Sequence, residues 1–165
     1  MTRRSKLTPD SRTADKFVMR ISQEMQDAII ELADSPWNAR STNGEYTVGL
    51  YNFIHEKDVV VANLERLKIQ ARKLGLDDVK ILSGIKRIAF DRRQPEKDVT
   101  CKFVIRLYQN QRDDVYNCSL DQKYDRTMRI FIYEAMYWWL NISLDIRALG
   151  LAIAEAQGTV YSVAC

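Results

Sequence analysis

Basic side chains near the N-terminus are the residues in this sequence best suited to chemistry, and that chemistry is the binding of anionic groups. Six of the first 20 residues are Lys or Arg and two are acidic, whereas the net charge of the whole chain is only +3. Two of them, Lys16 and Arg20, flank Val18 at alternate positions. Lys and Arg are charged hydrogen-bond donors, so they suit anionic or acceptor-rich partners.

Residues for covalent, acid–base or metal chemistry are not grouped in a recognisable motif. His55 lies in no recognisable motif with a carboxylate or a cysteine. The sequence also lacks a Gly-rich phosphate loop, a nucleophile elbow and a pair of acidic residues at a spacing typical of acid–base catalysis. Cys101, Cys118 and Cys165 form no C-x-x-C pair, which argues against zinc and fits a reducing cytosol. We therefore expect no enzymatic activity and no cofactor.

A short strand must position the alternating basic residues. Residues 1–14 are polar and basic with no apolar period, so they are predicted to form a flexible arm. From Lys16 to Ile21 the residues alternate between two sides, with Phe17, Met19 and Ile21 on one and Lys16, Val18 and Arg20 on the other, as a half-buried strand requires.

Two short helices are predicted to follow this strand. Ser22 can cap the first, whose apolar residues recur at helical spacing: Met25, Ala28, Ile29 and Leu32. Pro36 ends it. The second should start at Ser41 or Thr42, the latter in a T-x-x-E capping box with Glu45, and carry Tyr46, Leu50, Phe53 and Ile54 inward.

A strand and two helices of this size bury too little surface to be stable alone, and the strand finds no partner among them. We therefore predict that two chains pair through this segment. The alternative for the strand by itself is an exposed strand on an ordinary sheet.

This order of elements resembles the Arc-like ribbon-helix-helix repressors. The resemblance includes the residues that lead into the strand, Ser11–Ile21, and those that open the second helix, Arg40-Ser-Thr-Asn-Gly-Glu45. The resemblance covers about a quarter of the chain. It implies an intertwined β-α-α dimer whose two strands form a ribbon in the DNA major groove. Of the buried Arg–Glu–Arg cluster of Arc, it would keep Arg40 and Glu45, whereas the third position falls on Gly49.

The resemblance also implies the roles of individual residues. Lys16, Val18 and Arg20 would face base edges, with Arg20 or Lys16 donating to guanine and Val18 touching a thymine methyl group. Phosphates would be held by the second-helix N-terminus and nearby basic groups: Arg12, Arg40, Ser41, Thr42 and Asn43.

In the rest of the chain the sequence predicts secondary structure but no functional residues. Beyond the ribbon-helix-helix segment, 15–56, the spacing predicts a connecting helix over 57–75 with Gly75 as its C-cap. Residues 76–165 are predicted to be an α+β domain, with a hairpin of strands at Val99–Tyr108 and Val115–Leu120. A long aromatic-rich helical region, 121–157 with breaks near Asn141 and Gly150, completes it.

The expected function is that of a sequence-specific transcriptional regulator, a repressor, which binds double-stranded DNA as a homodimer or as a tetramer or higher assembly. An antitoxin-like or viral host-takeover protein is the alternative, with the C-terminal domain capturing a protein partner. A structural DNA role in plasmid transfer or partition is a third. The sequence predicts no signal peptide and no membrane span, so we expect a cytoplasmic protein. The resemblance implies a bacterial or phage-encoded protein that associates with the nucleoid.

Overall fold

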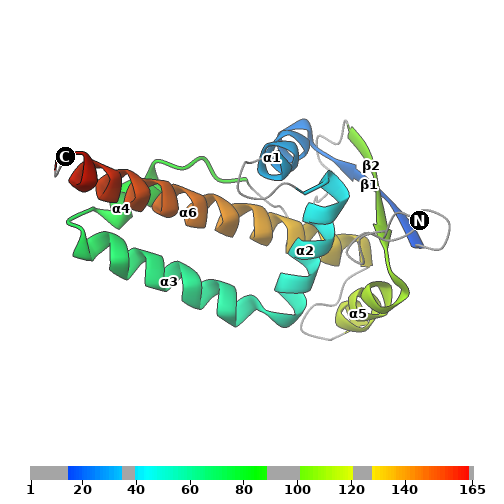
Figure 1. Cartoon of the computed structure of the whole chain (residues 1–165). Helices are drawn as coiled ribbons and strands as arrows, with labels where there is room; N and C mark the ends of the chain where they lie inside the picture. Colours follow the sequence, from blue (N-terminus) through cyan, green and yellow to red (C-terminus); the bar gives the residue numbers. More distant parts are fainter. Residues whose placement is uncertain (1–14, 35–39, 89–100, 121–127, 164–165) are drawn as a thin grey trace, which may run out of the picture. The chain divides into compact units, whose positions relative to one another are not determined.

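The computed structural model describes residues 15–34, 40–88, 101–120 and 128–163, in two strands and six helices (Figure 1). In chain order these elements are β1 (Asp15–Ile21), α1 (Gln23–Ala33), α2 (Thr42–His55), α3 (Lys57–Lys73), α4 (Asp78–Ser83), β2 (Cys101–Leu107), α5 (Gln109–Leu120) and α6 (Met128–Val163). No helix in the described residues is both long and apolar enough to cross a membrane.

The elements form two compact units. One unit combines β1, α1 and α2 with β2, α5 and α6 up to Leu140, and the other combines α3 and α4 with the rest of α6. The division therefore does not follow the predicted boundary after residue 75. Two separate stretches of the chain share the first unit, and β1 of one pairs with β2 of the other.

The first strand takes its partner from the same chain. β1 and β2 lie antiparallel and side by side, with Lys16 opposite Arg106, Val18 opposite Val104 and Arg20 opposite Lys102 (Figure 1). The prediction that a second chain must supply the partner strand is wrong for this structure. The first β-α-α segment holds no second strand, and the partner strand begins at Cys101, 80 residues after the end of β1 at Ile21.

The first unit contains the same succession of elements twice. Each element of the second copy begins 86 residues after its counterpart in the first. The strands begin at Asp15 and Cys101, the first helices at Gln23 and Gln109, and the second helices at Thr42 and Met128. The sequences of the strands agree as well, because Lys-Phe-Val-Met-Arg-Ile at 16–21 and Lys-Phe-Val-Ile-Arg-Leu at 102–107 are identical at four of six positions.

A single hydrophobic core lies beneath the ribbon and is built from both copies. Residues at corresponding positions of the two copies are buried in pairs: Met19 with Ile105, Ile21 with Leu107, Ile29 with Val115, Tyr46 with Ile132 and Leu50 with Met136. The copies interlock, since the Tyr46 ring of α2 stacks on Phe103 of β2 with 4.7 Å between centroids. Burial on this scale is the main source of stability in such a small fold.

Several predicted elements are confirmed near the N-terminus. Ser22 caps α1, because its hydroxyl oxygen accepts a hydrogen bond from the Met25 N–H at 3.2 Å. The inward positions Met25, Ile29 and Leu32 are buried. In α2, Tyr46, Leu50 and Phe53 are buried and Ile54 is partly buried against the core.

The predicted hairpin is wrong in its second strand. Residues 109–120 form helix α5 rather than a strand at Val115–Leu120. Val115 and Ser119, four residues apart, are its buried positions, which is helical rather than alternating spacing. The predicted strand Val99–Tyr108 is confirmed over Cys101–Leu107. Helix α6 runs through Asn141 and Gly150 without the predicted breaks.

The second unit is helical in its described part, and α3 ends as predicted. Gly75 follows α3 with a φ of 77°, a conformation that favours glycine. The N–H groups of Gly75 and Leu76 donate to the carbonyls of Arg72 and Ala71, both at 3.0 Å, as in a Schellman motif. Arg72 then pairs with Asp78 of α4 through two hydrogen bonds of 2.9 and 2.8 Å, which lower the pKa of that carboxyl.

Candidate functional site

The outer face of the ribbon carries a symmetric set of six residues. Lys16, Val18 and Arg20 come from β1, and Lys102, Val104 and Arg106 occupy the facing positions of β2. Lys16, Arg20 and Lys102 are exposed, as is Val18 with 43% of its surface accessible, while Val104 and Arg106 are partly exposed. Met19 and Ile21 of β1, and Ile105 and Leu107 of β2, are buried in the core on the opposite face. We call these six residues the ribbon face.

The charges on the ribbon face oppose each other. Lys16 faces Arg106 and Arg20 faces Lys102 across the strands, and like charges in directly opposed positions destabilise a sheet. Among the described residues, none forms an ion pair with any of these four side chains. Four cations thus lie along roughly 13 Å of ribbon, where an anionic partner would relieve their repulsion.

The start of α2 is attached to this ribbon by a side chain. The Asn43 amide donates to the Arg106 carbonyl at 3.2 Å, and its oxygen accepts from the Arg106 N–H at 2.8 Å. Both bonds use the backbone edge of β2 that faces away from β1. They fix the N-terminus of α2 beside the strand that carries Arg106.

The N-terminus of α2 has its cap at Ser41. The Ser41 hydroxyl accepts from the Gly44 N–H at 3.0 Å, and its carbonyl accepts from the Glu45 N–H at 3.0 Å. No described residue accepts from the N–H groups of Thr42 and Asn43. These two groups, at the positive end of the helix dipole, are suited to an anion.

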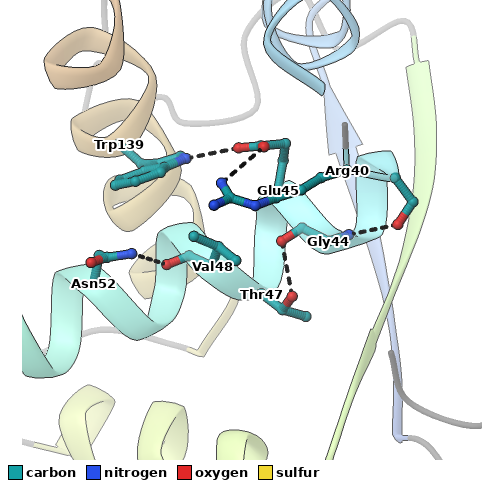
Figure 2. A network of polar contacts seen from close by, with 8 residues as sticks. Arg40, Gly44, Glu45, Thr47, Val48, Asn52 and Trp139 are labelled. Atoms are coloured by element: carbon teal, nitrogen blue, oxygen red, sulfur yellow. Dashed lines mark hydrogen bonds and ion pairs between the residues drawn. The ribbon is translucent and has the colours of Figure 1, made fainter. Parts of the chain in front are cut away.

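The predicted capping box between Thr42 and Glu45 is wrong, because Glu45 points inward. Its side chain is fully buried and accepts from Arg40 Nη1 at 3.3 Å and from the Trp139 indole Nε1–H at 3.1 Å. Figure 2 shows Trp139 reaching Glu45 from α6, while Arg40 approaches from the start of α2. A buried carboxylate needs such partners, since leaving one unpaired is costly.

Gly49 makes room for that arrangement. A Cβ at this position would lie 2.9 Å from Trp139 ring atoms and 3.1 Å from the Met136 sulfur. The prediction that Arg40 and Glu45 remain while Gly49 interrupts the cluster is therefore confirmed. The structure adds that the tryptophan indole occupies the space and supplies the second donor to Glu45.

The predicted site residues divide into three groups. Lys16, Val18 and Arg20 lie on the ribbon face. Arg40, Ser41, Thr42 and Asn43 lie at the start of α2, where the side chains of Arg40, Ser41 and Asn43 already have the partners described above. Arg12 lies outside the described residues.

Sequence reasoning missed Lys102, Val104 and Arg106 as ribbon residues. The sequence predicts their strand, Val99–Tyr108, but as part of a separate domain. The repeated Lys-Phe-Val-x-Arg at 16–20 and 102–106 was the signal that would have found them.

Metal binding requires a close grouping of ligating side chains. Within the described part of the chain, no group of three or more His, Cys, Asp or Glu residues could hold a metal ion. His55 pairs instead with Asp114 of α5 at 3.0 Å, on the surface. Burial raises the pKa of Tyr46 far above its ordinary value, so its hydroxyl stays protonated within the core.

Comparisons with known proteins bear on the first copy of the repeat. Residues 11–50 match the family model described as Arc-like DNA binding domain. The match covers β1, α1 and the first part of α2. It therefore includes the ribbon-face residues of β1 and the start of α2, where Asn43 is hydrogen-bonded to β2. A search of curated proteins gave no match, and neither did a search of solved structures.

Proposed function

We propose that this protein is a sequence-specific DNA-binding regulator that represses transcription, and that its β1–β2 ribbon enters the major groove. The match of residues 11–50 to the Arc-like DNA binding domain supports a DNA-binding regulator. The observation that carries the proposal is the exposure of Lys16, Val18 and Arg20 on one face of a ribbon whose other face is buried.

Base reading follows from the chemistry of this face. A two-stranded ribbon fits the width of the major groove, where guanine presents O6 and N7 as acceptors and thymine presents a methyl group. The Arg20 guanidinium can donate to both guanine acceptors, Lys16 can donate to one, and Val18 can contact the methyl group. No described acidic residue competes for these two cations.

Phosphate contacts at the start of α2 would fix the position of the ribbon without reading sequence. Thr42 and Asn43 would offer their backbone N–H groups, and Arg40 retains 38% of its side-chain surface for a second contact. Asn43 acts mainly as a positioning residue here, because its amide holds β2. Arg12 would add a further phosphate contact from the N-terminal arm.

Repression would result from occupation of a promoter, which excludes the transcription machinery from the same DNA. The proposed setting is a bacterial nucleoid, for a gene of the bacterium or of a phage. The mechanism requires no cofactor, since the contacts come from side chains and backbone groups of this chain.

The test is a selection of bound duplexes from random double-stranded DNA, followed by a reporter gene placed behind the enriched site. We expect enrichment of a defined site, and reporter expression that falls when the protein is produced. The triple variant K16A/V18A/R20A should enrich no site. Enrichment of no sequence by the wild type, or equal binding to the enriched and a scrambled duplex, would contradict the proposal.

A further inference from the structure

The two strands of the ribbon are related by a half-turn. Because they are antiparallel with Val18 opposite Val104, an axis between these two valines exchanges Lys16 with Lys102 and Arg20 with Arg106. Each exchange places a residue on one of the same type. The ribbon face therefore has the two-fold symmetry expected of two identical chains, although one chain builds it.

The core below the ribbon is also complete without a second chain. Met19, Ile21, Ile105 and Leu107, the inward residues next to the ribbon face, are no more than 1% exposed. Helices of both copies cover them, and α2 of the first copy holds β2 of the second through Asn43. A single β-α-α copy would leave the apolar side of its strand exposed and would require another chain to cover it. Here the second copy in the same chain covers it.

From these observations we infer that Lys102, Val104 and Arg106 are the second half of the base-reading set, and that one chain reads both halves of a two-fold symmetric DNA site. The inference rests on the proposed DNA-binding function. Its chemical consequence is a site in which each guanine contacted from β1 has a counterpart across the dyad contacted from β2.

The second half-set has the properties that base reading needs. No described residue forms an ion pair or a hydrogen bond with the side chains of Lys102 and Arg106. Arg106 is only partly exposed, and its Nε is buried without a hydrogen-bond partner among the described residues. The terminal guanidinium nitrogens are the groups that would donate to guanine O6 and N7.

The first experiment tests whether one chain forms the ribbon, and it does not depend on DNA. Cysteines at Val18 and Val104, in a background with Cys101, Cys118 and Cys165 changed to serine, lie at opposed positions of the antiparallel pair. They should form a disulfide when oxidised glutathione is added as the oxidant. Mixed ¹⁴N-labelled and ¹⁵N-labelled chains report whether the bond joins one chain or two.

We expect the disulfide within single chains, and no mixed-label species. The single variant V18C is the control, because it can be linked only between chains. A disulfide that joins light and heavy chains would overturn the inference. The second measurement needs no variant and determines the mass of the wild-type protein bound to its enriched duplex. The mass should correspond to one protein chain for each symmetric site. A mass that corresponds to two chains would overturn the inference.

The reading role is tested by the matched variants R20A and R106A on the duplex that the wild type enriches. Each should weaken binding to that duplex by about five- to 150-fold and relax the preference at one of two dyad-related base pairs. R106K keeps the charge but loses the two-pronged contact, so it should restore affinity for random DNA and not the base preference.

The outcomes separate the inference from the proposed function. Relaxed preference for R20A with no effect of R106A, or an equal loss on all sequences for R106A, would overturn the role of β2 and leave DNA binding standing. If the wild type enriches no duplex, the proposed function and the reading role both fall. In that case the disulfide experiment still decides whether one chain forms the ribbon.

Discussion

At the scale of single residues, some polar side chains stabilise the fold beneath the ribbon, whereas others lie on its outer face. Glu45 is the clearest case, because its sequence position suggested a helix cap while its buried carboxylate accepts from Arg40 and Trp139. A local motif cannot foresee this, since Trp139 lies 94 residues away. The outward residues behave differently, because alternation along a strand predicts their direction without reference to any partner.

The first prediction concerns the reading of bases by Arg20. Arg20→Ala should relax base preference and cost about 1–3 kcal/mol of binding free energy on the enriched site. Arg12→Ala, which changes a proposed phosphate contact, should instead weaken all duplexes alike and flatten the dependence of affinity on salt. Titrations of both variants at several salt concentrations check this. An equal loss on specific and random DNA for Arg20→Ala would contradict its role.

A second prediction concerns the indole of Trp139. Trp139→Phe removes the donor to a buried oxygen of Glu45 and should lower the free energy of unfolding by about 1–3 kcal/mol, as measured by chemical denaturation. Glu45→Gln and the double variant complete a cycle. If the two changes simply add, the indole and the carboxylate are not coupled and the assignment is wrong.

The third prediction compares two glycines within helices. Alanine usually stabilises a helix by about 1 kcal/mol relative to glycine, and this should hold for Gly150→Ala, because nothing lies within 4 Å of the added methyl group. Gly49→Ala should destabilise the protein by about 1–3 kcal/mol, since the methyl group would overlap Trp139. Thermal unfolding of the two variants should shift in opposite directions, and a stabilised Gly49→Ala would show that Trp139 can move away.

At the scale of elements, repetition of β-α-α explains both the correct and the incorrect parts of the sequence analysis. The first copy was found because its strand alternates and its helices have clear caps at Ser22 and Ser41. In the second copy the strand and the long helix α6 are predicted from the sequence, whereas α5 is not. Helix α5 lacks a strong apolar stripe, as only Val115 and Ser119 are buried in it.

A prediction at this scale concerns the attachment of α2 to β2. Asn43→Ala removes two hydrogen bonds to the Arg106 backbone and should cost about 1–3 kcal/mol of unfolding free energy. Asn52→Ala is the matched control, because that amide bonds only to the Val48 carbonyl within α2. Denaturant titration should show the larger loss for Asn43→Ala. Equal losses would mean that the contact between α2 and β2 contributes little.

At the scale of the whole molecule, pairing within the chain replaces pairing between chains. A stable fold that needs two chains unfolds at a temperature that depends on protein concentration, whereas a fold completed by one chain does not. We expect the unfolding midpoint of this protein to stay constant over a hundredfold range of concentration, as measured by circular dichroism. A midpoint that rises steadily with concentration would indicate a fold that depends on association.

The sequence by itself determined the local parts of this protein. Several features follow from spacing over a few residues: the two sides of the strand from Lys16 to Ile21, the Ser22 cap of α1, the glycine that ends α3, and the outward direction of Lys16, Val18 and Arg20. Interactions between neighbours in the chain decide such features, so they can be read from one segment at a time.

Only the tertiary structure decided which segments meet. The pairing of β1 with β2, the burial of Glu45 beside Trp139 and the placement of Lys102, Val104 and Arg106 on the ribbon face join residues from distant parts of the sequence. The physical reason is that an unpaired strand with an apolar face can be satisfied by any strand of suitable pattern, in the same chain or in another. Alternation shows that a partner is needed, and packing of the complete chain determines which partner it is.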